Sequence, residues 1–68
     1  MAVKNLYKVQ LDIKKRQRWL ENWVTLRIVA NGNLHTAINK AERVGKRLCD
    51  AQKARATSIE WLAEIDAV

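Results

Sequence analysis

The chain lacks or nearly lacks several residue types that would otherwise define its class. Its 68 residues include no proline, no phenylalanine, two glycines, one cysteine and one histidine. A disulfide within one chain is excluded because Cys49 is the only cysteine, and Cys49 with His35 is too small a ligand set for a zinc site. A domain of this size buries only about 60% of the surface that its unfolded chain exposes. Self-association therefore remains open as a source of stability.

Long apolar runs are also missing. No stretch approaches the roughly 18 consecutive apolar residues that a membrane-spanning helix needs. The first residues, Met1 to Asn5, lack the apolar core of a signal peptide. We therefore expect a cytoplasmic protein in which Cys49 stays reduced as a small buried hydrophobe.

The motifs of common catalytic sites do not occur in the sequence. It has no glycine-rich phosphate loop, no nucleophile elbow, no metal-ligand cluster and no pair of carboxylates beside a base or nucleophile. His35 is expected on the polar surface near the start of a helix. We expect neither an enzyme nor a cofactor nor a metal ion.

Acidic residues are scarce relative to basic ones. Thirteen Lys and Arg against seven Asp and Glu give a net charge of +6. Residues 1 to 55 hold all thirteen basic side chains and four of the acids, whereas residues 56 to 68 hold three acids and no base. A basic excess favours nucleic acid, anionic surfaces or acidic proteins as partners.

Two segments show the alternation of apolar and polar residues that is typical of strands with one wet face. They are residues 6 to 13 and residues 23 to 30, and the second is rich in β-branched residues. The side chains expected to face inward are Tyr7, Val9, Leu11, Ile13, Val24, Leu26, Ile28 and Ala30.

The period then changes from two to between three and four, which predicts a helix. Asn33 is well placed to cap it, because its side-chain oxygen can accept a hydrogen bond from an early backbone N–H. The apolar stripe consists of Leu34, Ala37, Ile38, Ala41, Val44, Leu48 and Cys49. Gly45 lies within this stripe at a cost of about 1 kcal/mol relative to alanine, so we expect the helix to approach a sheet closely there.

Near residue 56 the period returns to two. Ile59, Trp61, Ala63, Ile65 and Ala67 would face inward, with Trp61 in the core. A second helix is the alternative, and the absence of proline leaves room for it. We predict an α+β fold of one domain over residues 1–68, in which one helix packs on one face of a three-stranded antiparallel sheet. The element order is strand, strand, helix, strand, with spatial order 2-1-3 if the crossover is right-handed.

The most basic segment of the sequence lies between the two first strands. Four positive charges and an indole gather there: Lys14, Lys15, Arg16, Arg18 and Trp19. Residues 14 to 22 would form a connection of about nine residues, longer than an ordinary hairpin loop and more typical of a functional loop. Lys and Arg release counterions from a phosphate backbone, and a Trp face can stack on a base. The alternative is a solvated turn with Trp19 and Leu20 folded back onto the sheet.

The polar side of the expected helix carries a second group of cations. On a helical wheel with about 100° per residue, Lys40, Arg43 and Arg47 share one arc beside the apolar stripe. Arg43 and Arg47 are four residues apart and repel each other, which favours an anionic partner. Asp50 and Glu42 partly neutralise this face, so an ordinary solvated surface is the alternative.

The sheet face away from the helix would expose an unusual share of apolar side chains for so small a domain. These are Leu6, Trp23, Val29 and Leu62, among the polar residues Lys8, Gln10, Arg27, Glu60 and Glu64. The face could be a homodimer interface, a protein-binding patch, or a shelf covered by Trp19 and Leu20. Arg27 could add a secondary contact to a partner of the basic segment.

Residues 30–41, Ala-Asn-Gly-Asn-Leu-His-Thr-Ala-Ile-Asn-Lys-Ala, place a polar cap between a strand and an Ala-Ile-x-x-Ala helix. In this segment, and in outline over residues 6–66, the chain resembles small phage-encoded inhibitors of host RNA polymerase and some anti-CRISPR proteins. The resemblance implies a compact module without chemistry of its own that blocks a host nucleoprotein machine in the bacterial cytoplasm. Some of those proteins mimic DNA with acidic surfaces, and the basic charge here disfavours such mimicry.

The leading hypothesis is a non-catalytic regulatory or anti-defence protein of this phage type. It would bind a host nucleic-acid machine, or the nucleic acid on it, through the basic segment. A nonspecific DNA- or RNA-binding protein is one alternative. A structural protein that forms homo-oligomers through the open sheet face is another.

Overall fold

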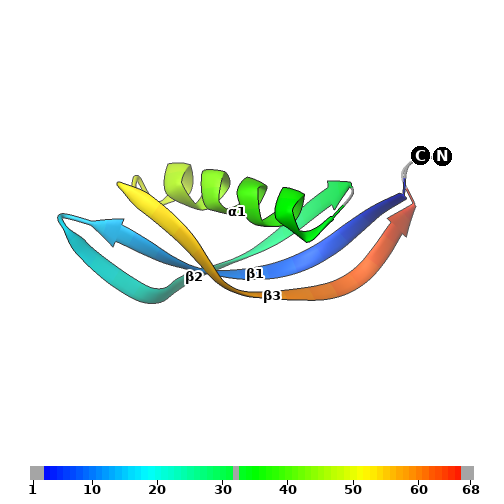
Figure 1. Ribbon diagram of the computed structural model, residues 1–68, viewed down its shortest axis with the longest axis horizontal. Coiled ribbons are helices and arrows are strands. Elements are labelled where there is room, and N and C mark those ends of the chain that lie inside the picture. The colour runs from blue at the N-terminus through cyan, green and yellow to red at the C-terminus, as the bar shows by residue number, and fades with distance from the viewer. Residues whose placement is uncertain (1–2, 32, 67–68) are drawn as a thin grey trace.

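The computed structural model describes residues 3–31 and 33–66, so the predicted position of Ala67 lies outside the described residues. The elements are β1 (Val3–Lys15), β2 (Arg18–Asn31), α1 (Leu34–Leu48) and β3 (Lys53–Asp66). The three strands form one antiparallel sheet in the order β2-β1-β3, and α1 lies across one face of it (Figure 1). The predicted α+β fold and strand order are confirmed, and the alternative of a second helix near the C-terminus is wrong.

The sheet is much longer than the helix. The domain measures 43 × 17 × 16 Å. A helix of 15 residues spans about 22 Å, whereas a strand of 14 residues spans roughly 45 Å. Both ends of the sheet therefore extend beyond α1, the β1–β2 turn at one end and the start of β1 with the end of β3 at the other (Figure 1).

The hydrophobic core lies between the centre of the sheet and α1. Its buried apolar side chains are Tyr7, Val9, Leu11, Ile13, Ile28, Ala30, Ala37 and Ala41. This set, with Val24 and Leu26 partly buried and packed against it, confirms the alternation predicted for the first two strands. Gly45 is also buried, and a Cβ at that position would overlap Leu11 Cδ1, so the close approach expected from the sequence is confirmed.

Both ends of α1 carry capping motifs. Asn33 caps the N-terminus as predicted, since its Oδ1 accepts a hydrogen bond from Thr36 N at 3.2 Å. At the other end Ala51 N donates to Lys46 O at 2.9 Å and Asp50 N donates to Arg47 O at 3.3 Å. This is the Schellman pattern, and it requires the left-handed backbone of Asp50, with a φ of 49°.

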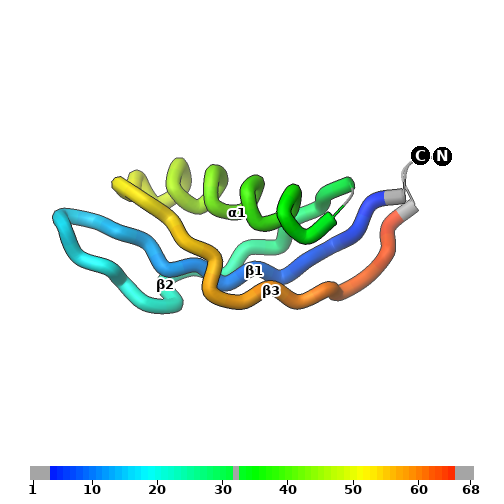
Figure 2. The backbone as a smooth tube through the Cα atoms, in the orientation of Figure 1, coloured from blue at the N-terminus to red at the C-terminus, as the bar shows by residue number. Residues whose placement is uncertain are grey.

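Strand β3 departs from the predicted alternation at two β-bulges. Its pairing with β1 shifts at Thr57 and again at Leu62, and Figure 2 shows the bend of β3 in its gold to orange part. After the second bulge Ala63 lies opposite Leu6, so it shares the face away from α1 instead of facing inward. The uninterrupted inward series predicted for this strand is therefore wrong.

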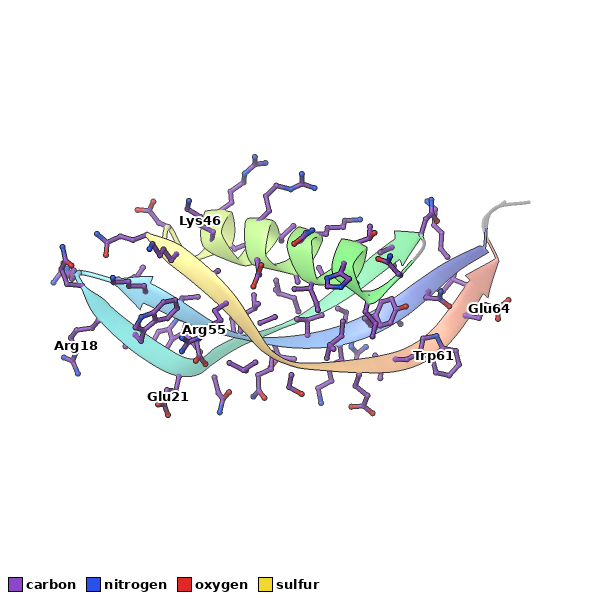
Figure 3. The ribbon with its side chains drawn as sticks, viewed as in Figure 1. Arg18, Glu21, Lys46, Arg55, Trp61 and Glu64 are labelled. Atoms are coloured by element: carbon purple, nitrogen blue, oxygen red, sulfur yellow. The ribbon has the colours of Figure 1, made fainter. Side chains whose placement is uncertain are left out.

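Trp61 does not belong to the core. It lies opposite Tyr7, but its side chain is 55% exposed and its Nε1 donates a hydrogen bond to Asn5 Oδ1 at 3.1 Å. In Figure 3 it lies on the part of β3 that extends beyond the N-terminal end of α1. The prediction that Trp61 is buried fails because no helix covers that part of the sheet.

Candidate nucleic-acid interface

The basic segment between the first two strands is a strand hairpin and not a long loop. β1 continues to Lys15 and β2 begins at Arg18, so only Arg16 and Gln17 form the turn. Both have positive φ values, 51° and 67°, as in the type I′ turns that suit two-residue hairpins. The predicted nine-residue loop over residues 14 to 22 is wrong. The charged residues of this segment belong to the ends of β1 and β2, which pair with each other up to the turn.

The hairpin turn is held against the segment that joins α1 to β3. Gln17 N donates to Gln52 Oε1 at 3.1 Å, and Gln52 N donates to Lys14 O at 2.7 Å. These two bonds bring the last turn of α1 and the first residues of β3 beside the turn. The hairpin turn thus meets the connection between α1 and β3, which lies 35 residues later in the sequence, at one end of the domain.

This end gathers nine of the thirteen Lys and Arg residues, and we name it the basic end. Its members are Lys14, Lys15, Arg16, Arg18, Arg43, Lys46, Arg47, Lys53 and Arg55. Figure 3 shows Arg18, Lys46 and Arg55 at this end, far from Trp61 and Glu64 at the other. Six of the nine were predicted as site residues from the sequence.

Lys46, Lys53 and Arg55 were missed in the sequence analysis. Lys46 lies in the last turn of α1, beside Arg47, which the sequence analysis does predict as a site residue. The other two lie at the start of β3, which was expected to begin near residue 56. The run Lys53-Ala-Arg55, with cations at i and i+2, is the signal that could have placed both on one face of a strand.

Two predicted site residues lie away from the basic end. Lys40 Nζ donates a hydrogen bond to Val29 O at 2.8 Å, which ties α1 to β2 in the other half of the domain. Arg27 lies opposite Lys8 on the open face of the sheet. Neither shares a hollow with the hairpin turn among the described residues.

Three open hollows follow one another around the basic end. One of about 390 Å³ lies between Trp19, α1 and the start of β3, and its lining includes Arg43 and Lys46. A second, of about 360 Å³, shares these two residues and reaches Asp50. A third of about 360 Å³ continues from Asp50 to Lys15 and Arg16. Six of the nine cations therefore line a continuous, accessible surface.

Two of the nearby carboxylates are already engaged within the fold. Asp12 is buried and accepts hydrogen bonds from Asn22 N at 2.8 Å and from Arg55 Nη2 at 2.9 Å. The backbone N–H of Asn22 and then the Arg55 guanidinium hold the pKa of Asp12 below its ordinary value. Glu42 Oε2 accepts a hydrogen bond from Ala56 N at 3.0 Å. Asp12 is thus paired with Arg55, one of the nine cations of the basic end, and Glu42 is bonded to the backbone of β3.

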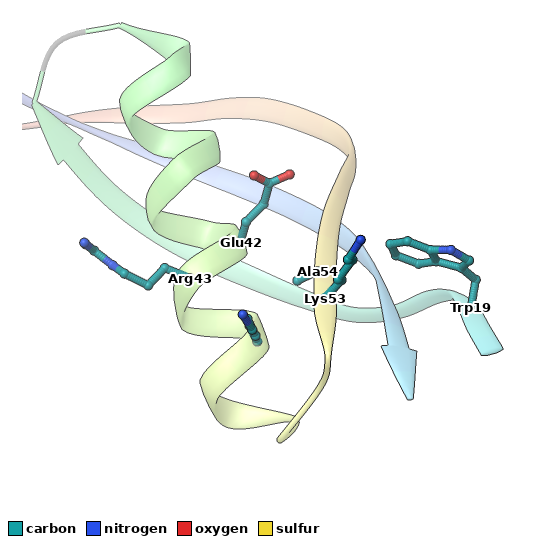
Figure 4. A pocket seen from close by; sticks show the side chains of 6 residues that line it. Trp19, Glu42, Arg43, Lys53 and Ala54 are labelled. Atoms are coloured by element: carbon teal, nitrogen blue, oxygen red, sulfur yellow. The ribbon is translucent and has the colours of Figure 1, made fainter. Parts of the chain in front are cut away.

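Trp19 presents part of its indole beside the cations. The Arg55 guanidinium lies 4.2 Å from the centre of the Trp19 ring, a cation–π arrangement. The side chain is nevertheless 38% exposed, and it lies in the strand end opposite Lys14. The indole is packed on one neighbour and open to the adjoining hollow (Figure 4).

The open sheet face carries its apolar residues in separate places. Val29, Leu6 and Ala63 form a row across the three strands, and Leu62 lies at the adjoining bulge. Trp23 is 58% exposed and lies six residues from Val29 along β2, roughly 20 Å away.

A polar hollow that includes Lys8, Gln10 and Thr25 occupies the middle of this open face. Glu64 was expected on the same face. The register places it opposite Asn5, on the side of α1, because the bulge at Leu62 changes the alternation.

In residues 3–31 and 33–66, no group of three or more His, Cys, Asp or Glu side chains is placed to hold a metal ion. The one helix described is not long and apolar enough to cross a membrane. No protein-family model, no curated protein and no solved structure matches this chain.

Proposed function

We propose that this chain is a non-catalytic nucleic-acid-binding domain that holds phosphate groups at its basic end. The observation that carries the proposal is that nine cations from the hairpin, the end of α1 and the start of β3 lie at one end of the domain, where six of them line adjoining open hollows. A phosphate backbone is a regular row of single negative charges, and each Lys or Arg contact releases condensed counterions from it. A surface with several cations spaced over a few hollows suits such a polymer.

Like charges at the basic end lie directly opposite one another. Lys15 pairs with Arg18 across the hairpin, and Lys14 pairs with Lys53 across the β1–β3 ladder. Such pairs are destabilising in the free protein, typically by a few tenths of a kcal/mol each. A bound polyanion relieves this repulsion, so the arrangement favours binding over stability of the free domain.

The two residues of the hairpin turn are unfavourable for its backbone conformation, which supports a role in binding. Type I′ turns favour Asn-Gly, since both central residues have positive φ, yet Arg16 and Gln17 occupy them here. A side chain other than glycine in this conformation costs about 1 kcal/mol. Backbone strain that is retained beside a cluster of cations supports a binding role for that turn.

The proposal is tested by two matched variants that remove the same charge from different places. One replaces Lys14, Lys15, Arg16 and Arg18 by Gln, and the other replaces Lys4, Lys8, Arg27 and Lys40 by Gln. Binding of both variants and the wild type to a labelled oligonucleotide is measured by fluorescence anisotropy between 50 and 200 mM salt. With about five phosphates contacted, the wild-type affinity should fall about 100-fold over that range for a single strand.

The first variant should lose most of the affinity and flatten the salt dependence, whereas the second should keep both. Equal losses in the two variants would mean that net charge alone drives the binding and would contradict a site at the basic end. Absence of salt-dependent binding by the wild type would contradict the proposed function altogether.

The resemblance to phage-encoded inhibitors supports a second candidate, in which the same end contacts a host nucleoprotein machine. The strand-strand-helix-strand layout on which it depends is the one that the chain adopts. Affinity capture from a bacterial lysate, with and without nuclease, separates the two. A protein captured after nuclease treatment, and lost with the four-residue Gln variant of the hairpin, would favour the inhibitor. Loss of every captured protein with nuclease would favour direct binding of nucleic acid.

A further inference from the structure

The hollow beside Trp19 has the composition of a nucleotide site. An exposed indole and Ala54 provide apolar surface, and Arg43, Lys46 and Lys53 provide positive charge around it. Glu42 also lines the hollow, and its carboxylate accepts a hydrogen bond from Ala56 N of β3, so the side chains that line the hollow carry a net charge of +2. In Figure 4 Trp19 and the α1 residues lie on opposite sides of the hollow, with Lys53 and Ala54 of β3 between them. Its volume of about 390 Å³ is ample for one nucleobase.

The Trp19 indole is fixed before any ligand arrives. Asn22 N and Arg55 hold the two oxygens of Asp12, and the Arg55 guanidinium in turn lies 4.2 Å from the centre of the Trp19 ring. Asp12 itself is buried, so this chain of contacts begins in the interior of the domain. An aromatic side chain that is already ordered binds more tightly, because less conformational entropy is lost on binding.

The shape of the basic end disfavours insertion into a duplex. The major groove of B-DNA is about 12 Å wide and admits a single helix or a two-stranded ribbon. The hairpin here is no free ribbon, since Gln52 bonds to both Lys14 and Gln17 and keeps the end of α1 beside it. The cross-section of the domain is 17 × 16 Å. Bases stacked within a duplex would also be out of reach of Trp19.

We propose that the hollow takes an unstacked nucleobase of a single strand onto Trp19, with the adjoining phosphates on Lys46, Lys53 and Arg43. This inference rests on the proposed function and narrows its ligand to single-stranded nucleic acid. Stacking of a base on an aromatic side chain tolerates any base, so the site binds without strong sequence preference. Its removal lowers affinity by roughly 5- to 150-fold.

The test uses Trp19 as its own probe. In a Trp23→Phe, Trp61→Phe background Trp19 is the remaining tryptophan, and its fluorescence is recorded during titration with an oligothymidylate, a duplex of equal length and free thymidine monophosphate. We expect the single strand to quench Trp19 and to bind at least 10-fold more tightly than the duplex. Free thymidine monophosphate should bind far more weakly than the strand, because it makes only one phosphate contact.

A pair of variants in the otherwise wild-type chain separates stacking from charge. Trp19→Ala should weaken single-strand binding by roughly 5- to 150-fold and leave duplex binding within about twofold. Trp23→Ala, which removes a more exposed indole from the open sheet face, should change neither. Because quenching is measured on the native Trp19, the test does not depend on the folding of Trp19→Ala.

The outcomes distinguish this inference from the proposed function. Equal affinity for strand and duplex without a change in Trp19 fluorescence would overturn the stacking site and leave phosphate binding at the basic end standing. Tight binding of free thymidine monophosphate would replace the strand by a small nucleotide as the ligand. Absence of binding to all three probes would overturn both.

Discussion

Replacing Gly45 by alanine should destabilise the domain, although alanine is the better helix former. Gly45 lies in the interior of α1, where the exchange gains about 1 kcal/mol of helix propensity. The new methyl group would, however, overlap Cδ1 of Leu11, whose side chain is fully buried in the core. Overpacking of this kind costs about 1 to 3 kcal/mol. We therefore expect a net loss of up to about 2 kcal/mol.

The sign should reverse once the obstructing atom is gone. Leu11→Val removes the Cδ atoms and by itself costs about 1 kcal/mol. In that background the new methyl group meets Leu26 Cδ1 at 3.6 Å and a γ carbon of residue 11, for which the Leu11 Cγ distance is 3.8 Å, and both are ordinary contact distances. The propensity gain of about 1 kcal/mol should then appear as stabilisation.

The four members of this cycle can be compared by urea unfolding and by thermal melting. One kcal/mol corresponds to about 4–8 °C in a domain of this size. Asn39→Ala, at an exposed position of α1, serves as the control and should add about 0.5 kcal/mol in both backgrounds. If Gly45→Ala stabilises the wild type as much as it stabilises Leu11→Val, Leu11 moves aside freely. The close approach of helix and sheet would then not explain the glycine.

Two further predictions concern acids at the basic end. Because hydrogen bonds from Asn22 N and Arg55 lower the folded-state pKa of Asp12 below the ordinary 3.8, its stabilising contribution is present in full above that value and is lost as the pH falls below it through the folded-state pKa. Acid unfolding of the wild type should therefore be steeper over this range than that of Asp12→Asn, and parallel curves would contradict the assigned contacts. Asp50→Gly should raise the free energy of unfolding by about 0.5 to 1 kcal/mol, because glycine adopts the left-handed backbone of the Schellman motif without strain. Asp50→Ala should give no such gain in the same urea titration, and an equal gain would point to removal of the negative charge instead.

The sequence by itself determined the parts of the fold that depend on one segment at a time. The inward faces of β1 and β2 follow from a period of two, and α1 follows from a period between three and four with Asn33 as its cap. The glycine at position 45, within the apolar stripe, predicted the close approach of α1 to the sheet. The cations at residues 14–18 were recognised as a group, although their conformation was not.

Only the tertiary structure decided the features that need several segments together. Strand β3 pairs along its whole length with β1, and the bulges at Thr57 and Leu62 set which of its side chains face α1. Trp61 is exposed because α1 covers about half the length of the sheet, which no local pattern reveals. The hairpin closes over two residues because both strands continue through the charged segment.

The basic end itself is a product of topology. An apolar pattern is repeated along the sequence because burial acts on every turn or pair of residues, so it can be read locally. Charges carry no such period, and Lys46, Lys53 and Arg55 come beside the hairpin only because the α1–β3 connection returns there. The sequence therefore determined that the domain is basic. The packing of one short helix on a longer sheet decided where that charge gathers and set Trp19 beside it.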